Sequence, residues 1–266
     1  MLSALLVTVV GLAAIGIALF RITADTGSSA LAAPVTTTAP ADENASPTPA
    51  PTTPAPAPTT PPPPVLRLAG PVPSAGSGEF DFGATQGPVA GRSGTLRRYR
   101  VAVEVGSEAD VEEFGTLVER TLSDPRSWIG GDQVRLQRVA GGGNHDFIVY
   151  LATAQTAARM CQAGWVDIRI DGKPYTSCRA QGKVIINLDR WRLSVDHFVR
   201  AGVPLDVYRA YVVNHEVGHE LGHGHERCPG GGDPAPVMMQ QTLFLNGCVA
   251  NPWPYLAGER YAGPPL

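Results

Sequence analysis

The chain has 266 residues, of which 43% are hydrophobic and 17% are charged, and its formal net charge is −3 at pH 7. A chain without a basic surplus lacks the positive surface that binds phosphate backbones, so nucleic acid is excluded as an expected partner. Composition divides the chain into an apolar start, a Pro-rich stretch and a remainder of the size of one globular domain.

The apolar start is the first predicted element. Residues 2–20 carry no charge, and a helix of that length can just cross the hydrocarbon core of a bilayer. No basic residue precedes this run, and the first arginine, Arg21, follows it. The small residues at 29–33 suit a signal peptidase but lie well beyond the apolar run. We therefore predict an uncleaved transmembrane anchor at residues 1–22 with the rest of the chain extracellular; cleavage and secretion are the alternative.

A Pro-rich stretch follows the anchor. Residues 23–64 consist mainly of Pro, Thr, Ala and Ser and contain almost nothing that a core can bury. Such a segment does not offset the loss of backbone entropy by packing, which predicts a disordered, semi-rigid spacer. Residues 65–94 remain rich in Gly and Pro, and they either continue the linker or form an extended arm on the domain. We place the linker at residues 23–94 and the domain at residues 95–266.

Hydrophobic periodicity in the domain changes repeatedly between the strand and helix patterns. The predicted strands are residues 99–105, 134–139, 147–151, 165–170 and 184–188, and the predicted short helices are residues 154–161 and 195–200. Residues 107–110 resemble a capping box, which predicts a further helix that ends near Asp124. This order of elements favours an α+β fold with a mixed sheet.

The longest predicted helix begins near residue 205 and ends near Gly222, within the run His-Glu-Val-Gly-His-Glu-Leu-Gly-His-Gly-His at residues 215–225. Residues four apart share one face of a helix, so His215 and His219 can present two imidazoles to one metal ion. Gly222 can adopt the left-handed conformation that ends a helix, which returns His225 as a third ligand. Three neutral imidazoles with a position left for water are typical of a catalytic site that holds one zinc ion.

Glu216 directly follows the first predicted ligand, so its carboxylate can reach a metal-bound water without being a ligand itself. We predict that it is the general base of an amide hydrolysis. The alternative is a His-rich helix end with ordinary surface charge, and five fixed residues in one run make that coincidence a poor explanation. His223 lies four residues after His219 and competes as a ligand only if the helix continues past Gly222.

The run matches every fixed position of His-Glu-x-x-His-x-x-Gly-x-x-His, and it resembles the zinc-binding signature of the metzincin clan of metallopeptidases. The resemblance implies a methionine in a tight turn beneath the metal, for which Met238 is the candidate and Met239 the alternative. Several metzincins place a tyrosine two residues after this methionine, where this chain has Gln240 or Gln241. A side chain with the role of that tyrosine is therefore not identified by the motif.

A narrower resemblance covers roughly residues 95–256. This part is similar to a family of actinobacterial cell-envelope proteins of unknown function that are presumed zinc peptidases, and the similar stretches are residues 187–191, 211–216, 234–238 and 251–254. The resemblance implies a zincin-like catalytic domain outside the cytoplasmic membrane. Zincins commonly hold an extended substrate along a strand at the sheet edge, and a strand within residues 165–188 is the candidate for that role here. We therefore expect a monomeric zinc metalloendopeptidase that acts on protein or peptide. The alternatives are a non-catalytic zinc-containing scaffold module and an amide hydrolase of peptidoglycan peptides.

The four cysteines all lie in the domain, and they are Cys161, Cys178, Cys228 and Cys248. An even number beyond a membrane segment indicates disulfides formed in an oxidising compartment. The pairs Cys161–Cys178 and Cys228–Cys248 are the most local of the three possible connectivities. Cys228 follows His225 by three residues, so metal ligation is its alternative role.

Overall fold

The computed structural model describes residues 62–266. The predicted anchor at residues 1–22 and the first part of the predicted linker lie outside the described residues. Between residues 62 and 266, none of the helices combines the length and the hydrophobicity that crossing a bilayer requires.

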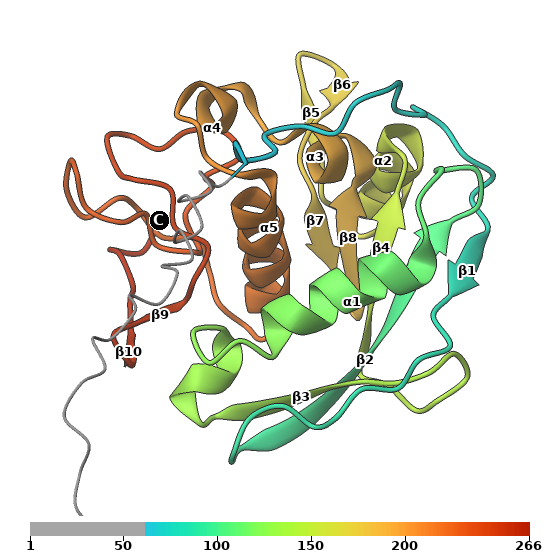
Figure 1. The fold of residues 1–266 in the computed structure, drawn as a ribbon, viewed down its shortest axis with the longest axis horizontal. Coiled ribbons are helices and arrows are strands. Elements are labelled where there is room, and N and C mark those ends of the chain that lie inside the picture. The colour runs from blue at the N-terminus through green and yellow to red at the C-terminus, as the bar shows by residue number, and fades with distance from the viewer. Residues whose placement is uncertain (1–61) are drawn as a thin grey trace, which may run out of the picture. The chain divides into compact units, whose positions relative to one another are not determined.

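A mixed six-stranded sheet forms the centre of the domain (Figure 1). Its strands are β1 (Phe80–Phe82), β2 (Thr95–Glu104), β3 (Val134–Arg138), β4 (Phe147–Ala152), β7 (Cys178–Ala180) and β8 (Lys183–Asn187). Strands β3, β2, β4 and β8 pair in parallel, whereas β1 and β7 pair antiparallel with β2 and β8. The order β1-β2-β4-β8-β7 leaves β7 at one edge. The predicted α+β class with a mixed sheet is confirmed.

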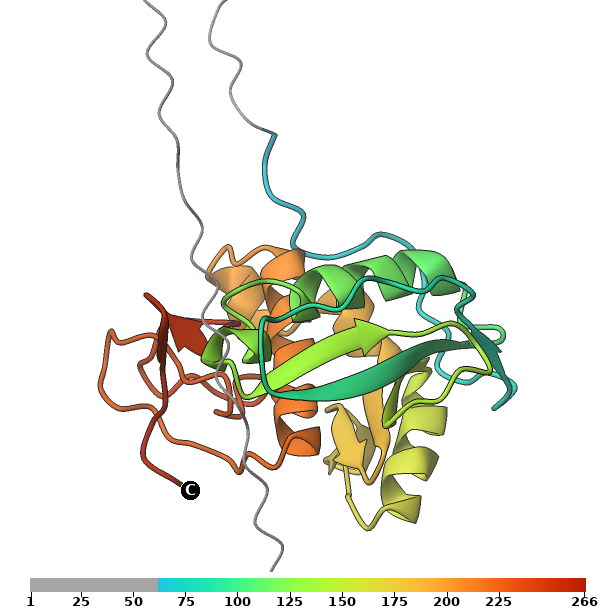
Figure 2. The same cartoon turned by 90° about the horizontal axis from the view of Figure 1, so that it is seen from below.

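Helices cover both faces of the sheet (Figure 2). Helices α1 (Val111–Leu122) and α5 (Leu205–Glu220) lie on one face, and α2 (Ala154–Ala163) lies on the other. The short helices α3 (Leu188–Leu193) and α4 (Asp196–Arg200) connect β8 to α5. Because successive side chains of a strand point to opposite faces, Val184 packs under α5 while its neighbour Ile185 packs under α2. A strand buried on both faces reads as a continuous apolar run, which is why β8 is readily predicted.

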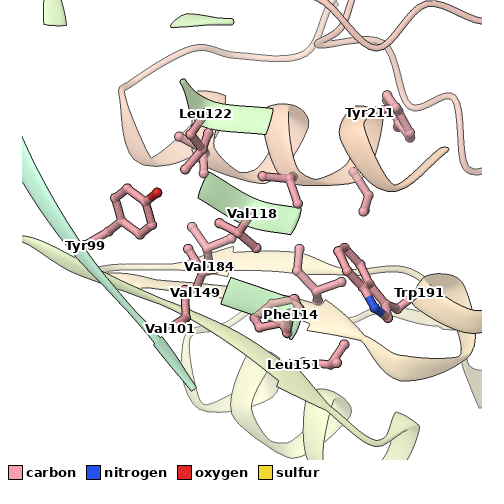
Figure 3. Close-up of a cluster of buried hydrophobic side chains, with 14 of the residues drawn as sticks. Tyr99, Val101, Phe114, Val118, Leu122, Val149, Leu151, Val184, Trp191 and Tyr211 are labelled. Atoms are coloured by element: carbon pink, nitrogen blue, oxygen red, sulfur yellow. The ribbon is translucent and has the colours of Figure 1, made fainter. Parts of the chain in front are cut away.

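The main core lies between the sheet and the pair α1 and α5 (Figure 3). Phe114 of α1 meets Trp191 of α3 edge to face, with ring centroids 5.0 Å apart. Val118 of α1 and Val149 of β4 are fully buried in the same cluster. Burying a side chain of this size stabilises the fold by about 1.5–3 kcal/mol relative to exposing it. This core fixes α5, and therefore the motif that α5 carries, against the sheet.

Helix α1 begins later than its predicted cap. Asp110 is the N-cap residue, and its Oδ1 accepts a 2.7 Å hydrogen bond from the backbone N–H of Glu113. The capping box at residues 107–110 therefore does not form, although the helix itself is present. The reason is local: Glu108 has φ 58°, a left-handed conformation that a right-handed helix cannot include.

Residues 62–94 form an arm that lies on the domain. The backbone N–H of Leu68 donates to Arg192 O at 2.8 Å, Ala90 pairs with Leu136, and β1 joins the sheet. Within the described residues the folded part therefore begins well before residue 95, the boundary that composition suggested. The arm is attached mainly through backbone hydrogen bonds, which leave no hydrophobic periodicity in the sequence.

Two further segments differ from their predictions. In place of one strand at residues 165–170, the structure has a loop followed by the hairpin β5 (Arg169–Ile170) and β6 (Lys173–Pro174). Trp165 has φ 64°, which interrupts any extended run. The remaining elements are the 3₁₀ turn η1 (Trp128–Gly131) and the hairpin β9 (Tyr255–Leu256) and β10 (Glu259–Arg260). Residues 221–254 contain no helix and no strand.

Candidate metal centre

Helix α5 ends at the position that the motif requires. Its last helical residue is Glu220, and Gly222 follows with φ 98°. The backbone N–H of Gly222 donates to His219 O and that of His223 donates to Gly218 O, at 3.1 and 2.9 Å. These two bonds form a Schellman motif, which needs a residue with positive φ and so favours glycine. The chain then turns back towards the helix with His225.

Three histidines meet where the chain turns back. His215, His219 and His225 each offer one nitrogen, and these atoms all lie within 4.8 Å of one another. The Nε2 atoms of His219 and His225 are 3.1 Å apart. Within residues 62–266, these three histidines form the one group of at least three His, Cys, Asp or Glu side chains that could hold a metal ion.

Backbone carbonyls fix the orientation of two of the rings. Val237 O lies 2.9 Å from His215 Nδ1, and His223 O lies 2.8 Å from His219 Nδ1. A carbonyl can only accept a hydrogen bond, so both Nδ1 atoms carry the proton and both Nε2 atoms keep a free lone pair. This tautomer and orientation are those of a histidine that ligates a metal through Nε2.

Burial keeps the three rings neutral. Burial, followed by the positive field of His219, lowers the pKa of His215 to about 3. Burial also lowers the pKa of His219 and of His225, and Arg179 contributes to the lowering at His219. A metal competes with protons for imidazole nitrogens, so neutral rings are ready to bind it near pH 7. The donor set therefore fits a divalent cation that accepts nitrogen ligands.

Glu216 lies in the same cleft as the three histidines. Its side chain is buried, and burial raises its pKa to about 8. It makes no side-chain hydrogen bond or ion pair with any residue in the described part of the chain. A buried carboxyl group without a protein partner is costly, and a cation held close by would favour its charged form.

The cleft has a volume of about 360 Å³ and separates α5 from the edge strand β7 and from residues 240–243. Its lining residues are Val166, Asp167, Thr176, Ser177, Cys178, Arg179, Tyr211, His215, Glu216, His219, His225, Gln240, Thr242 and Leu243. Sequence reasoning missed Tyr211 and Arg179. Tyr211 precedes His215 by four residues, so helical spacing alone could have placed it on the same face. No pattern in the sequence marks Arg179.

Met238 lies beneath α5. It is fully buried, and a Cβ added at Gly218 would lie 2.4 Å from its Sδ atom, so the two are in direct contact. Met239 belongs to a separate cluster with Ala235 and Cys248. Of the two candidate methionines, Met238 is therefore the one packed against α5.

Two disulfides are present, Cys161–Cys178 and Cys228–Cys248, and residues 62–266 contain no free cysteine. The first joins α2 to the edge strand β7. The second closes the loop that carries Met238. Because Cys228 is bonded to Cys248, it is not a metal ligand. Disulfides are typical of an extracellular domain.

The remaining histidines and Asn214 have other partners. His223 stacks on Trp128 with ring centroids 4.3 Å apart, and His197 is hydrogen-bonded to Gln241 O. His145 contacts Gly143 O in a loop away from the cleft. Asn214 is buried next to His215, where it donates to Pro252 O and accepts from Ser127 Oγ. It therefore ties α5 to the segments on both sides of it.

Comparison with known proteins gives one family. The family described as "Protein of unknown function (DUF3152)" matches residues 66–256, which is well over half of the chain. The chain belongs to this family. Neither the curated proteins nor the solved structures contain a match to the chain.

Proposed function

We propose that the domain is a zinc-dependent metalloendopeptidase that hydrolyses peptide bonds outside the cytoplasmic membrane. The observation that carries the proposal is the position of Glu216, whose carboxyl group has no protein partner in the described residues and shares a cleft with the three histidines. A purely structural metal site gains nothing from such a group, and burying it costs free energy. A role as the general base, which accepts a proton from a water molecule acidified by the ion, would explain why the carboxyl group lies there.

In the proposed reaction His215, His219 and His225 hold the ion through nitrogen. Bound zinc supplies two effects, the acidification of a water molecule and the polarisation of the scissile carbonyl. Glu216 accepts the proton of the attacking water and later donates it to the nitrogen of the leaving amine. The carbonyl groups of Val237 and His223 hold the ligand rings in place throughout the cycle.

The position of β7 at the edge of the sheet favours a peptide as the substrate. Cys178 and Arg179 of this strand line the cleft, and β8 is the only strand paired with β7 in the described sheet. An extended peptide can pair with a free strand edge through its backbone, independently of most side chains. We therefore propose β7 as the edge strand within residues 165–188 that holds the substrate.

The location of the reaction follows from two arguments. The disulfides indicate an oxidising compartment. The apolar residues 2–20 are proposed to anchor the chain in the cell membrane with its C-terminal domain outside.

The test uses the full chain loaded with zinc and offered a peptide library and, separately, purified cell wall. We expect about one zinc ion per chain and cleavage of peptides. Glu216→Gln should keep the zinc and lose roughly 10²- to 10⁴-fold in kcat/KM. His225→Ala should lose the zinc. Glu113→Gln, on the exposed first turn of α1, is the matched control and should change neither property.

The outcomes separate the alternatives. Cleavage of cell wall but not of peptides would replace the peptidase by a peptidoglycan amide hydrolase. Bound zinc without hydrolysis of either material would favour a non-catalytic scaffold module. Wild-type chain that binds no zinc would refute the proposal at its first step.

A further inference from the structure

Arg179 is the middle residue of the edge strand β7, and it faces the ligand helix. It pairs with Val184 of β8, which packs in the core beneath α5. Its neighbours Cys178 and Ala180 belong to the cluster on the α2 side of the sheet. Since side chains alternate along a strand, the guanidinium of Arg179 lies on the side of α5. It lines the same cleft as the three histidines.

Glu220 holds this guanidinium in position. The Nε atom of Arg179 donates a 2.7 Å hydrogen bond to Glu220, which directly follows His219 at the end of α5. The Glu220 side chain is only 5% exposed, and it also accepts from Gly182 N at 3.3 Å. A contact through Nε fixes the plane of the guanidinium but uses one of its five donors.

The rest of the guanidinium is available to a ligand. The Arg179 side chain is 34% exposed, and its terminal nitrogens make no hydrogen bond to any described residue. A second cation also balances the charge of Glu220, because Arg97 Nη2 lies 3.7 Å from the other carboxylate oxygen of Glu220. Two terminal NH₂ groups of a fixed arginine match the two oxygens of a carboxylate.

The charges around the cleft favour an anion at this place. Among the lining residues in the described part of the chain, Arg179 is the only lysine or arginine. The acidic residues are Glu216 and Asp167, and Asp167 pairs with Arg169 at 3.2 Å. Three neutral imidazoles leave the charge of a bound dication uncompensated, which adds to the positive potential on the same side.

We propose that Arg179 determines specificity by binding a carboxylate of the substrate close to the scissile bond. The proposal rests on the proposed function, and it names a substrate class for the same site: peptides with an acidic group beside the cleavage point. That group is an Asp or Glu side chain if the domain cuts within a peptide, as proposed, or the free carboxylate if it cuts close to the end of the peptide. A hydrogen-bonded charge pair of this kind changes kcat/KM on the order of 10- to 100-fold.

The test compares matched peptides on the full chain loaded with zinc. One pair differs by Asp against Asn at each position around the cleavage point, and a second pair differs by a free against an amidated C-terminus. We expect wild type to prefer one acidic member on the order of 10- to 100-fold in kcat/KM, and Arg179→Gln to abolish the preference while leaving cleavage of the neutral peptides near the wild-type rate. The pair that shows the preference identifies the source of the carboxylate.

Arg97→Gln is the matched control, because Arg97 contacts the same Glu220 but does not line the cleft. It should keep the preference. Arg179→Glu should reverse the preference towards peptides with Lys at the same position. Zinc content and the urea midpoint, measured for every variant, separate a lost contact from a damaged fold.

Each outcome bears on one proposal. Equal preference in wild type and Arg179→Gln, or equal loss in Arg179→Gln and Arg97→Gln, would overturn the role of Arg179 while hydrolysis of neutral peptides still supports the peptidase. If wild type cleaves nothing, the proposed function fails, and binding of the acidic and neutral peptides to zinc-loaded chain is measured by titration. Weaker binding of only the acidic peptides to Arg179→Gln would then sustain the carboxylate site, and equal binding would end it.

Discussion

The backbone N–H and C=O groups of the domain find their hydrogen-bond partners in different ways before and after α5 in the chain. In the sheet half, residues 95–187, they are paired mainly within the sheet and the helices. The C-terminal segment, residues 221–266, has almost no regular structure, and side chains bind its carbonyl groups instead. The candidate metal centre combines both, since His215 and His219 come from the helix and His225 comes from the C-terminal segment. The position of this irregular segment, and of His225 on it, thus depends on a few contacts between distant residues.

Two buried amides show how the C-terminal segment is held. Gln241 Nε2 donates to Pro236 O and Asn251 O, at 3.1 and 2.8 Å. Asn251 Nδ2 donates to Ala235 O at 3.0 Å. These bonds fix Ala235 and Pro236, directly before Val237, whose carbonyl orients His215. Loss of order here is therefore expected to weaken metal binding at the candidate site, whereas an equal loss in the sheet half is not.

The largest expected effect comes from removing one disulfide at a time. The bonds Cys228–Cys248 and Cys161–Cys178 join residues 20 and 17 positions apart, and replacing either pair by serine should lower the free energy of unfolding by about 3 kcal/mol. Only loss of Cys228–Cys248 should also weaken zinc binding, because its loop contains Val237 and Met238. Urea unfolding and competitive zinc titration measure the two quantities. Equal zinc affinity in both variants would remove the distinction between the regions.

A smaller effect is expected from a single buried amide. Gln241→Ala leaves carbonyl groups without partners, which should lower the free energy of unfolding by about 2 kcal/mol and zinc affinity by roughly tenfold. Gln240→Ala is the matched control, because the Gln240 side chain makes no hydrogen bond to a described residue. Its stability to urea should equal that of wild type. A Gln241→Ala chain with unchanged zinc affinity would show that the segment orients His215 without this amide.

The smallest effect is expected at the start of α1, in the sheet half. Asp110→Ala removes the N-cap and should lower the free energy of unfolding by about 1 kcal/mol, with zinc affinity unchanged. Ser107→Ala should cost much less, because Ser107 Oγ is buried without a hydrogen-bond partner in the described residues. Chemical denaturation of both variants measures the difference. A greater loss in Ser107→Ala would mean that the predicted capping box forms in solution.

The sequence predicted the elements whose pattern is local. Strands β4 and β8 follow apolar runs, α5 follows its motif, and Gly222 ends the helix as expected. The positions of His215, His219 and His225 in one cleft also follow from spacing within a single helix and its turn. Periodicity is sufficient here because each contact joins residues a few positions apart.

The parts that were not predicted depend on contacts between distant residues. Arg179 reaches the cleft only because β7 pairs antiparallel with β8 at the sheet edge, next to α5. The arm at residues 62–94 and the helix α3 were missed for related reasons. Backbone hydrogen bonds hold the arm, and Asn187 caps α3 in a stretch that reads as a continuous apolar strand.

The attachment of the arm has a mechanical consequence. Val65 O accepts a 2.8 Å hydrogen bond from the backbone N–H of Leu205, the first residue of α5, whereas His219 lies in the last turn of this helix. At 1.5 Å per residue, the two points are about 20 Å apart along one rigid rod. Tension transmitted through the chain upstream of the domain would enter at the end of the rod remote from the cleft. A pull on Val65 would therefore act on the N-terminal end of α5, and the turn that carries His219 and His225 would lie outside the direct path of the force.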